Sequence, residues 1–130
     1  MNKKATILYV DREVNNINSF VAIFRRDYKI LTASSATEGF DILLNDTVHI
    51  VISDLYVEET DGLKFLLAVS RKYCKCTCIL ISDYPLNNAV SGSGIYKKLT
   101  KPWDETEFRI ILKSAYDLFL LKENVLNAFW

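Results

Sequence analysis

The chain has 130 residues, a length that fits one domain able to bury a core without disulfides or metals. Half of its residues are hydrophobic and a quarter are charged, a composition that excludes the disordered and fibrous classes. Lysine plus arginine and aspartate plus glutamate number 16 each, so no whole-chain field favours nucleic acid or an anionic membrane. We therefore expect no direct binding to either one.

The amino terminus and the apolar runs bear on location. The run of residues 5–10 stops at Asp11 with no small-residue cleavage site after it, which predicts a first strand rather than a signal peptide. No apolar stretch approaches the roughly 20 residues needed to span a bilayer. We predict a cytoplasmic location and no membrane segment.

Short apolar runs alternate with stretches of helical periodicity, a pattern typical of βαβ units. Strands are predicted, in chain order, at residues 5–10, 28–32, 50–53, 77–81 and 95–99. Between the first two, apolar residues recur at three- and four-residue spacing from Val14 to Phe24, which predicts a helix. The third run lacks alternation, as expected for a strand covered on both sides. The pattern predicts an α/β fold, a doubly wound five-stranded parallel sheet with helices on both faces.

Capping boxes mark two of the remaining helices. In Ser35–Glu38, the serine should accept from the backbone and the glutamate should reach back, so a helix is predicted to about Asn45. Another helix begins near Gly62, after an acidic loop. The box Asp104–Glu107 opens the last helix, which would be about 39 Å long if residues 105–130 are all helical. That length exceeds what is needed to cover the sheet.

Charged residues follow three of the predicted strands. Asp11, Asp54 and Lys101 each lie at or just beyond a strand end. In open α/β sheets the carboxyl ends of strands build the ligand sites, so we expect these three groups to converge. Arg12, directly beside the first carboxylate, complicates the site.

Three cysteines alternate as Cys74, Cys76 and Cys78. On one extended strand, thiols two residues apart would share a face at spacings of about 7 Å, which disfavours a disulfide between neighbours. A soft-metal site usually needs distant Cys or His partners as well, and His49 is the only histidine. We expect these cysteines to be small residues that lead into an inner strand.

The chain resembles a response-regulator receiver domain of two-component signalling. The similarity lies in the order Ile-Leu-Tyr-Val-Asp (7–11), Ile-Ser-Asp (52–54), Leu-Ile-Ser (80–82) and Leu-Thr-Lys-Pro-Trp (99–103). It covers about residues 5–118. The resemblance implies a flavodoxin-like sheet of order 2-1-3-4-5 and a phosphorelay function, with conformational signalling to a partner or effector rather than enzyme activity.

The resemblance also assigns roles to matching residues. Asp54 would be the phosphoacceptor for a histidine kinase, Ser82 would contact the bound phosphoryl group, and Lys101 would be its counter-cation. Asp11, Asp54 and the backbone carbonyl of Tyr56 would hold Mg²⁺. These types suit the chemistry, since phosphoryl transfer depends on positioning and charge neutralisation and Mg²⁺ prefers oxygen ligands. The bond before Pro102 would be cis.

Departures from the family pattern surround Arg12, which occupies the place of a usual acidic metal ligand. Arginine stays charged and cannot bind Mg²⁺. Its guanidinium could pair with Asp54 and stand in for the metal, leaving a degenerate receiver that binds partners without phosphotransfer. Alternatively, Arg12 points into solvent, and Glu13 or an acid of Glu58–Glu59 supplies the missing oxygen. Mg²⁺ binding would be weak or absent if Arg12 takes the place of the metal.

The segment that usually reports phosphorylation also departs from the pattern. Lys98 stands where relatives often have a switch aromatic, although Tyr96 is near. Glu58 replaces a usual proline. The connection 83–94 contains proline, asparagine and a Ser-Gly repeat, so any helix within it should be short or irregular. We expect output on this side to be altered.

We divide the chain into a receiver domain at residues 1–118 and a helical extension at 119–130. The extension is strongly apolar, which predicts a homodimer or an effector domain bound through the last helix. A helix folded back on its own domain and an end trimmed from a longer chain are the alternatives. An unrelated hydrolase or nucleotide-binding enzyme on a similar sheet is disfavoured, because the chain has neither a G-x-S-x-G motif nor a phosphate-cradling glycine loop.

Overall fold

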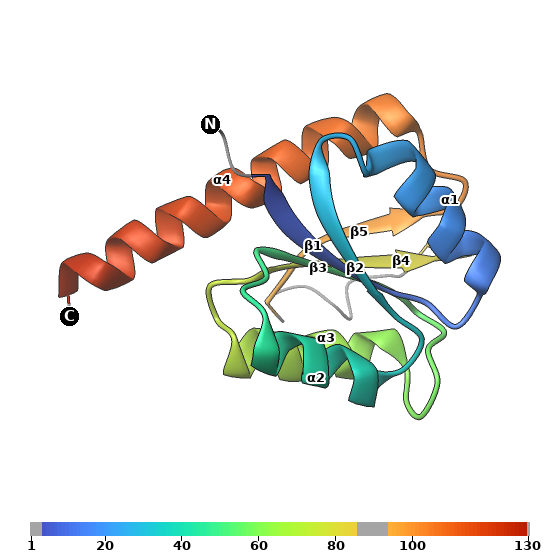
Figure 1. Cartoon of the computed structure of the whole chain (residues 1–130), viewed down its shortest axis with the longest axis horizontal. Coiled ribbons are helices and arrows are strands. Elements are labelled where there is room, and N and C mark those ends of the chain that lie inside the picture. The colour runs from blue at the N-terminus through green and yellow to red at the C-terminus, as the bar shows by residue number, and fades with distance from the viewer. Residues whose placement is uncertain (1–3, 86–93, 130) are drawn as a thin grey trace.

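The computed structural model describes residues 4–85 and 94–129, which form one parallel sheet with helices on both faces (Figure 1). In chain order the elements are β1 Ala5–Val10, α1 Val14–Phe24, β2 Tyr28–Ala33, α2 Ala36–Asn45, β3 Ile50–Asp54, α3 Gly62–Lys72, β4 Thr77–Ser82, β5 Ile95–Thr100 and α4 Glu105–Phe129. The strand order is β2-β1-β3-β4-β5, and every pairing is parallel. The predicted doubly wound, flavodoxin-like fold is confirmed.

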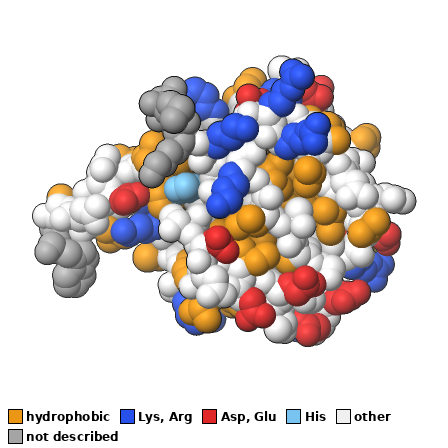
Figure 2. All heavy atoms as spheres, viewed as in Figure 1, with side chains coloured by type: hydrophobic (Ala, Val, Ile, Leu, Met, Phe, Trp, Pro, Cys, Tyr) orange, Lys and Arg blue, Asp and Glu red, His pale blue; other side chains and the backbone are white. Residues whose placement is uncertain are grey.

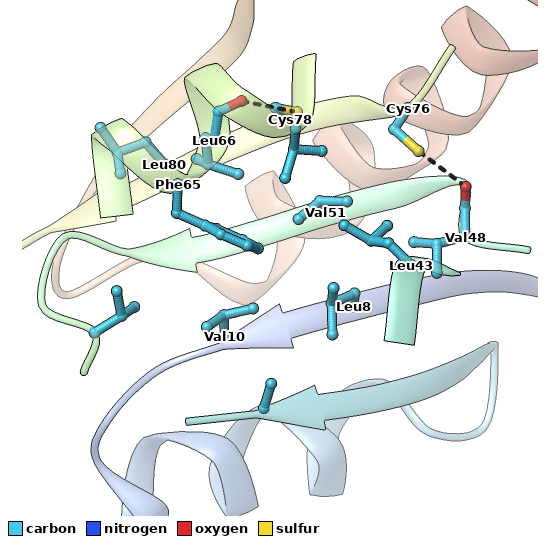
Figure 3. Packing of buried hydrophobic residues seen from close by; sticks show 13 residues of the cluster. Leu8, Val10, Leu43, Val48, Val51, Phe65, Leu66, Cys76, Cys78 and Leu80 are labelled. Carbon is cyan, nitrogen blue, oxygen red and sulfur yellow. Dashed lines mark hydrogen bonds between the residues drawn. The ribbon is translucent and has the colours of Figure 1, made fainter. Parts of the chain in front are cut away.

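Different helix pairs cover the two faces of the sheet (Figure 1). On one face, Phe20 of α1 and Phe108 of α4 pack with Ile52 of β3. On the other, Phe65 of α3 and residues of α2 pack against Val51 of the same strand, and Figure 3 shows this cluster. Side chains of a strand alternate between faces, so neighbouring β3 residues serve different cores. This double burial explains the uninterrupted apolar run.

The register of the sheet aligns the carboxyl ends of its strands. Val10 lies opposite Ser53, Asp54 opposite Ile81, and Ser82 opposite Thr100. The residues that follow these pairs therefore emerge along one edge. That edge is where the predicted charged residues lie.

Several strands run one residue further than the apolar runs predict. β2, β4 and β5 end at Ala33, Ser82 and Thr100, and β3 includes Asp54. Main-chain hydrogen bonds continue past the apolar residues, for example from Lys101 N–H to Ser82 O at 2.8 Å. A polar side chain does not interrupt the ladder, because only the backbone pairs.

The predicted cap of α2 is half correct. Ser35 Oγ accepts from Glu38 N–H at 3.1 Å, as expected. The Glu38 carboxylate instead accepts from the N–H and the hydroxyl of Ser34, at 3.2 and 2.6 Å. Ser34 can donate to the Glu38 carboxylate from both its N–H and its hydroxyl, whereas the backbone of Ser35 offers one N–H, so the contact with Ser34 is favoured. At α4, Asp104 Oδ2 accepts from Glu107 N–H at 2.8 Å.

The cysteines do not share one strand, so that expectation was wrong: β4 begins at Thr77, and of the three only Cys78 lies on it. Cys76 and Cys78 are buried, and Cys74 is exposed in the turn closed by the hydrogen bond from Cys76 N–H to Tyr73 O. The Cys76 thiol donates to Val48 O at 3.1 Å (Figure 3). Burial raises the pKa of the Cys76 thiol to about 11 and that of Cys78 to about 12. All three are free thiols, as predicted.

Helix α4 continues past the edge of the sheet (Figure 1). Its first half is buried through residues such as Leu112 and Ala115, whereas Leu120, Leu121 and Val125 are 40%, 59% and 46% exposed. The helix does not fold back on its domain. None of the helices in the described part of the chain combines the length and apolar character that crossing a membrane requires. The predicted irregular helix of the 83–94 connection falls mainly on residues 86–93, outside the described residues.

Gly62 begins α3 in close contact with the end of β3. Its N–H donates to Leu55 O at 2.7 Å, and a β-carbon at this position would lie 1.9 Å from Asp54 O and 2.8 Å from Ser53 Oγ. The clash would be with main chain, which cannot rotate away. A residue without a side chain is therefore required for α3 to pack beside Asp54.

Replacement of Gly62 by alanine is expected to destabilise the fold by about 3 kcal/mol, because the added methyl displaces the β3 backbone. Gly39→Ala is the matched control, since its β-carbon would meet the Phe65 ring at 2.8 Å and a side chain yields more readily. Urea unfolding followed by circular dichroism measures both. Equal losses in the two variants would contradict the main-chain clash.

Candidate functional site

Asp54 and Lys101 form a buried ion pair at the carboxyl edge of the sheet. Lys101 Nζ lies 2.6 Å from Asp54 Oδ1, and Asp54 is only 3% exposed. Among the described residues Oδ1 has no hydrogen-bond partner beyond this ion pair, whereas Oδ2 accepts from Tyr56 N–H at 2.9 Å. A buried carboxylate needs charges or donors in place of water. The ammonium of Lys101 is the group that neutralises Oδ1.

Asp11 is fully buried on the neighbouring strand end. Its Oδ1 accepts from Glu13 N–H at 2.9 Å, and its Oδ2 accepts from Asn16 Nδ2 at 3.1 Å and from the Tyr9 hydroxyl at 3.2 Å. Burial raises the pKa of the Asp11 carboxyl, the Glu13 N–H opposes this, and the charge of Asp54 raises it further. The predicted convergence of Asp11, Asp54 and Lys101 is therefore present.

The pKa of Lys101 reports the same cluster. Burial lowers it, but the hydrogen bond and charge of Asp54 and the charge of Asp11 raise it more, so the net shift is upward. Asp83 adds a weaker contact, with its Oδ1 3.8 Å from Lys101 Nζ and its side chain 62% exposed. Two buried carboxylates thus face one partly buried cation.

This excess of negative charge and the available oxygens fit a divalent cation. The carboxylates of Asp11 and Asp54 and the carbonyl of Tyr56 are donors of the kind that Mg²⁺ prefers, and Mg²⁺ commonly needs only one or two carboxylates beside its waters. Over residues 4–85 and 94–129, no group of three or more His, Cys, Asp or Glu side chains is placed to hold a metal. The available oxygen donors are therefore of the kind that Mg²⁺ binds, but a third acidic side chain is lacking among the described residues.

Arg12 lies at the mouth of the site without reaching Asp54. Its guanidinium carbon is 5.1 Å from the centroid of the Tyr56 ring, its Nε is 3.9 Å from Glu13 Oε1, and its side chain is 53% exposed. Its main-chain N–H donates to Tyr56 O at 3.4 Å. Of the two alternatives for Arg12, the fork-like pair with Asp54 is not formed, and the guanidinium contacts Tyr56 and Glu13 instead.

The acids expected to replace the missing ligand are also directed elsewhere. The Glu13 side chain is 63% exposed, and its ion pair is with Arg12. Glu59 Oε1 accepts from Thr37 N–H at 2.9 Å, at the start of α2, and Glu59 has a positive φ of 81°. Glu58 pairs its backbone with residues 34–36. Fixing this loop to α2 turns Glu59 away from Asp54.

Ser82 is buried at the end of β4, beside Lys101. Its hydroxyl donates to the carbonyl oxygen of Tyr84. A contact with a phosphoryl group on Asp54 would require the hydroxyl to exchange that partner. Ser82 is thus near the site, with its donor directed to the loop.

The remaining predicted residues lie on β5 and just after it. Lys98 is exposed, whereas Tyr96 is partly buried and packs against the α1 and α4 face of the core. The aromatic residue near this position therefore faces inward. The peptide bond between Lys101 and Pro102 is cis, as the resemblance implied.

Sequence reasoning missed Tyr9, Asn16 and Tyr84. Tyr9 precedes Asp11 by two residues, so strand periodicity places both on one face. Asn16 lies in the first turn of α1, one turn after Asp11. Tyr84 interacts with the Tyr56 side chain and raises the Tyr56 pKa. That contact joins two loops, and no local pattern predicts it.

A cavity of about 470 Å³ lies away from these residues, among His49, Cys76, Phe119 and Glu123. None of the predicted site residues lines it. The chemistry described above depends on the carboxyl edge of the sheet, where the charges are buried together. The cavity is therefore separate from that site.

The arrangement defines a class of protein, the doubly wound domains that gather charge at the carboxyl ends of β1, β3 and β5. The chain belongs to the response regulator receiver domain family, which matches residues 7–113. It is a receiver domain of a signalling protein of the phosphorelay type. The resemblance inferred from the motifs is thereby confirmed.

Two kinds of relative support this assignment. The hydrogenase transcriptional regulatory protein HoxA of Bradyrhizobium diazoefficiens is 27% identical over 98% of this chain, and HoxA of Cupriavidus necator is 30% identical over 78%. The chain spans about a quarter of these proteins, 27% and 22% of their lengths. The signal receiver domain of an HD domain-containing protein from Pseudomonas fluorescens has a TM-score of 0.88 and 25% identity, with 95% of each chain covered.

We expect Arg12→Asp to tighten Mg²⁺ binding by about tenfold, because it adds an oxygen ligand and removes a cation. Arg12→Gln removes only the cation and should tighten binding less. Titration of Mg²⁺ can be followed by the fluorescence of Trp103, two residues after Lys101, in a Trp130→Phe background. Unchanged Mg²⁺ affinity in Arg12→Asp would contradict the prediction.

Proposed function

We propose that Asp54 is the phosphoacceptor of this receiver domain and takes its phosphoryl group from a histidine kinase or a phosphotransfer protein. The observation that carries the proposal is the buried Asp54 carboxylate, whose Oδ1, within the described part of the chain, meets only Lys101 Nζ, at 2.6 Å. A carboxylate in that state is held in place and not saturated by hydrogen bonds. The modified domain then signals to a partner or effector by conformational change.

Each residue has a role in the proposed reaction. An oxygen of Asp54 forms a bond to phosphorus, the bond from phosphorus to the imidazole nitrogen of the donor breaks, and its electron pair stays on that nitrogen. Lys101 is the counter-cation of the phosphoryl oxygens. Ser82 exchanges its contact with Tyr84 for one of these oxygens. The domain assists its own phosphotransfer, and we do not assign it a separate enzyme activity.

Receiver domains typically bind Mg²⁺, and we propose that Asp11, Asp54 and the Tyr56 carbonyl hold it here. Glu13 is the nearest further acid in the chain to Asp11 but is paired with Arg12. Bound Mg²⁺ would neutralise charge on the phosphoryl oxygens. Because Arg12 stands beside Asp11, the affinity should be weaker than a third acid would give.

We propose a protein partner and a cytoplasmic location, where kinases use ATP. Figure 2 shows basic and acidic side chains on the same face, with most of the basic ones above the acidic ones. Such a mixed surface suits a protein of complementary charge pattern better than a nucleic acid or an anionic membrane. Lys98 on β5 would modulate signalling to this partner.

We further propose that residues 1–118 are the receiver domain and that residues 119–130 extend its last helix toward an effector domain or a second copy. Leu121 and Val125 are exposed and four residues apart, so they lie on one stripe of α4. Relatives of this chain are named transcriptional regulators and are about four times its length. An effector joined through α4 agrees with both observations.

The experiment that tests the proposed function is the intact mass of the protein after incubation with acetyl phosphate, with and without Mg²⁺. We expect one phosphoryl adduct in the wild type and none in Asp54→Asn, because the proposed reaction places the phosphoryl group on the Asp54 carboxylate. Asp83→Asn is the matched control, since this carboxylate also contacts Lys101 but is exposed.

An adduct that persists in Asp54→Asn would assign the phosphoryl group to another residue. A folded wild-type protein that forms no adduct with acetyl phosphate or with a phosphorylated histidine kinase would favour the phosphorylation-independent alternative. Circular dichroism of each variant confirms that the fold is intact.

A further inference from the structure

The backbone of Arg12 is hydrogen-bonded to Tyr56, two residues after the phosphoacceptor. Its N–H donates to Tyr56 O at 3.4 Å, while Tyr56 N–H donates to Asp54 Oδ2 at 2.9 Å. Two consecutive main-chain contacts thus connect Arg12 to the acceptor carboxylate. The side chain extends from this anchor over the ring of Tyr56.

The side-chain contacts of Arg12 leave its guanidinium available. An exposed ion pair at 3.9 Å contributes little to stability, and the cation–π contact with Tyr56 occupies the face of the group rather than its N–H donors. The guanidinium is therefore positioned beside the site and retains N–H groups without close partners among the described residues.

The charge balance changes when Asp54 becomes phosphorylated. The site already has two buried carboxylates against Lys101. An aspartyl phosphate replaces one carboxylate charge by a group of up to two charges, with three further oxygens that project beyond the carboxylate. A planar guanidinium binds such oxygens with two parallel hydrogen bonds.

We propose that Arg12 is a ligand of the phosphoryl group during its transfer to Asp54 and that it supports this transfer without a divalent cation. The inference rests on the proposed function of Asp54. Tyr56 is a positioning residue that holds the guanidinium over the mouth until the donor arrives. Arginine cannot bind a metal, but it can supply the charge that the metal would otherwise bring to the oxygens.

The step needs no additional reactant when acetyl phosphate is the donor. An oxygen of Asp54 bonds to phosphorus, the bond from phosphorus to the acetyl oxygen breaks, and the electron pair leaves with acetate. The three remaining phosphoryl oxygens stay on phosphorus and carry the charge that develops during transfer. Arg12 and Lys101 contact these oxygens from two strand ends, β1 and β5.

The test is the rate of adduct formation from acetyl phosphate in EDTA and in Mg²⁺, measured by intact mass. In the wild type the two rates should agree within about threefold. Arg12→Ala should be slower in EDTA by about a hundredfold to a thousandfold, the range seen when one preorganised donor to a transition-state oxygen is removed. Arg12→Lys keeps the positive charge but lacks the planar guanidinium, so its rate in EDTA should lie between those of the wild type and Arg12→Ala.

Arg26→Ala is the matched control, because Arg26 is an exposed arginine beyond the end of α1, and it should leave both rates unchanged. A merely structural role for Arg12 would lower both rates of Arg12→Ala equally and would overturn the proposal. A wild type that forms its Asp54 adduct only with Mg²⁺, at a rate independent of Arg12, would overturn this inference alone. No Asp54 adduct under either condition would overturn the proposed function together with it.

Discussion

The contact between Asp54 and Lys101 governs the chemistry of this domain. It unites the end of β3 with the residue after β5, which are separated in the sheet by β4. Because Asp54 is almost completely buried, its charge cannot be carried by water and must be met by the protein. The rest of the carboxyl edge is arranged around that requirement.

The parallel register of the sheet brings the neutralising groups close to Asp54. Three strand ends are aligned by main-chain hydrogen bonds, and the side chains that follow them need no long excursions to meet. Two cores, one on each face, hold the strands in place. A small residue at position 62 allows α3 to approach the same strand end. Stability of the fold and geometry of the site thus depend on the same few strands.

The sheet and the convergence of charges could be predicted because both follow from local patterns. Apolar runs locate strands, and polar residues directly after them lie at one edge. The placement of Arg12 could not be predicted this way, since it depends on the ring of Tyr56 and on where the loop after β3 runs. Glu59 shows the same limit, because its partner Thr37 is 22 residues away. Contacts between loops depend on tertiary structure, whereas contacts along a strand end are encoded nearby.

Helix α4 gives the domain the properties of a lever. It begins four residues after Lys101 and continues without interruption to Phe129, while its buried packing against the domain ends at Phe119. A tilt of about 5° about the start of the helix would move its far end by about 3 Å, because the helix rises about 1.5 Å per residue from Glu105 to Phe129. The displacement grows along the helix, so it is smallest near Lys101 and largest for anything attached to the end of the helix.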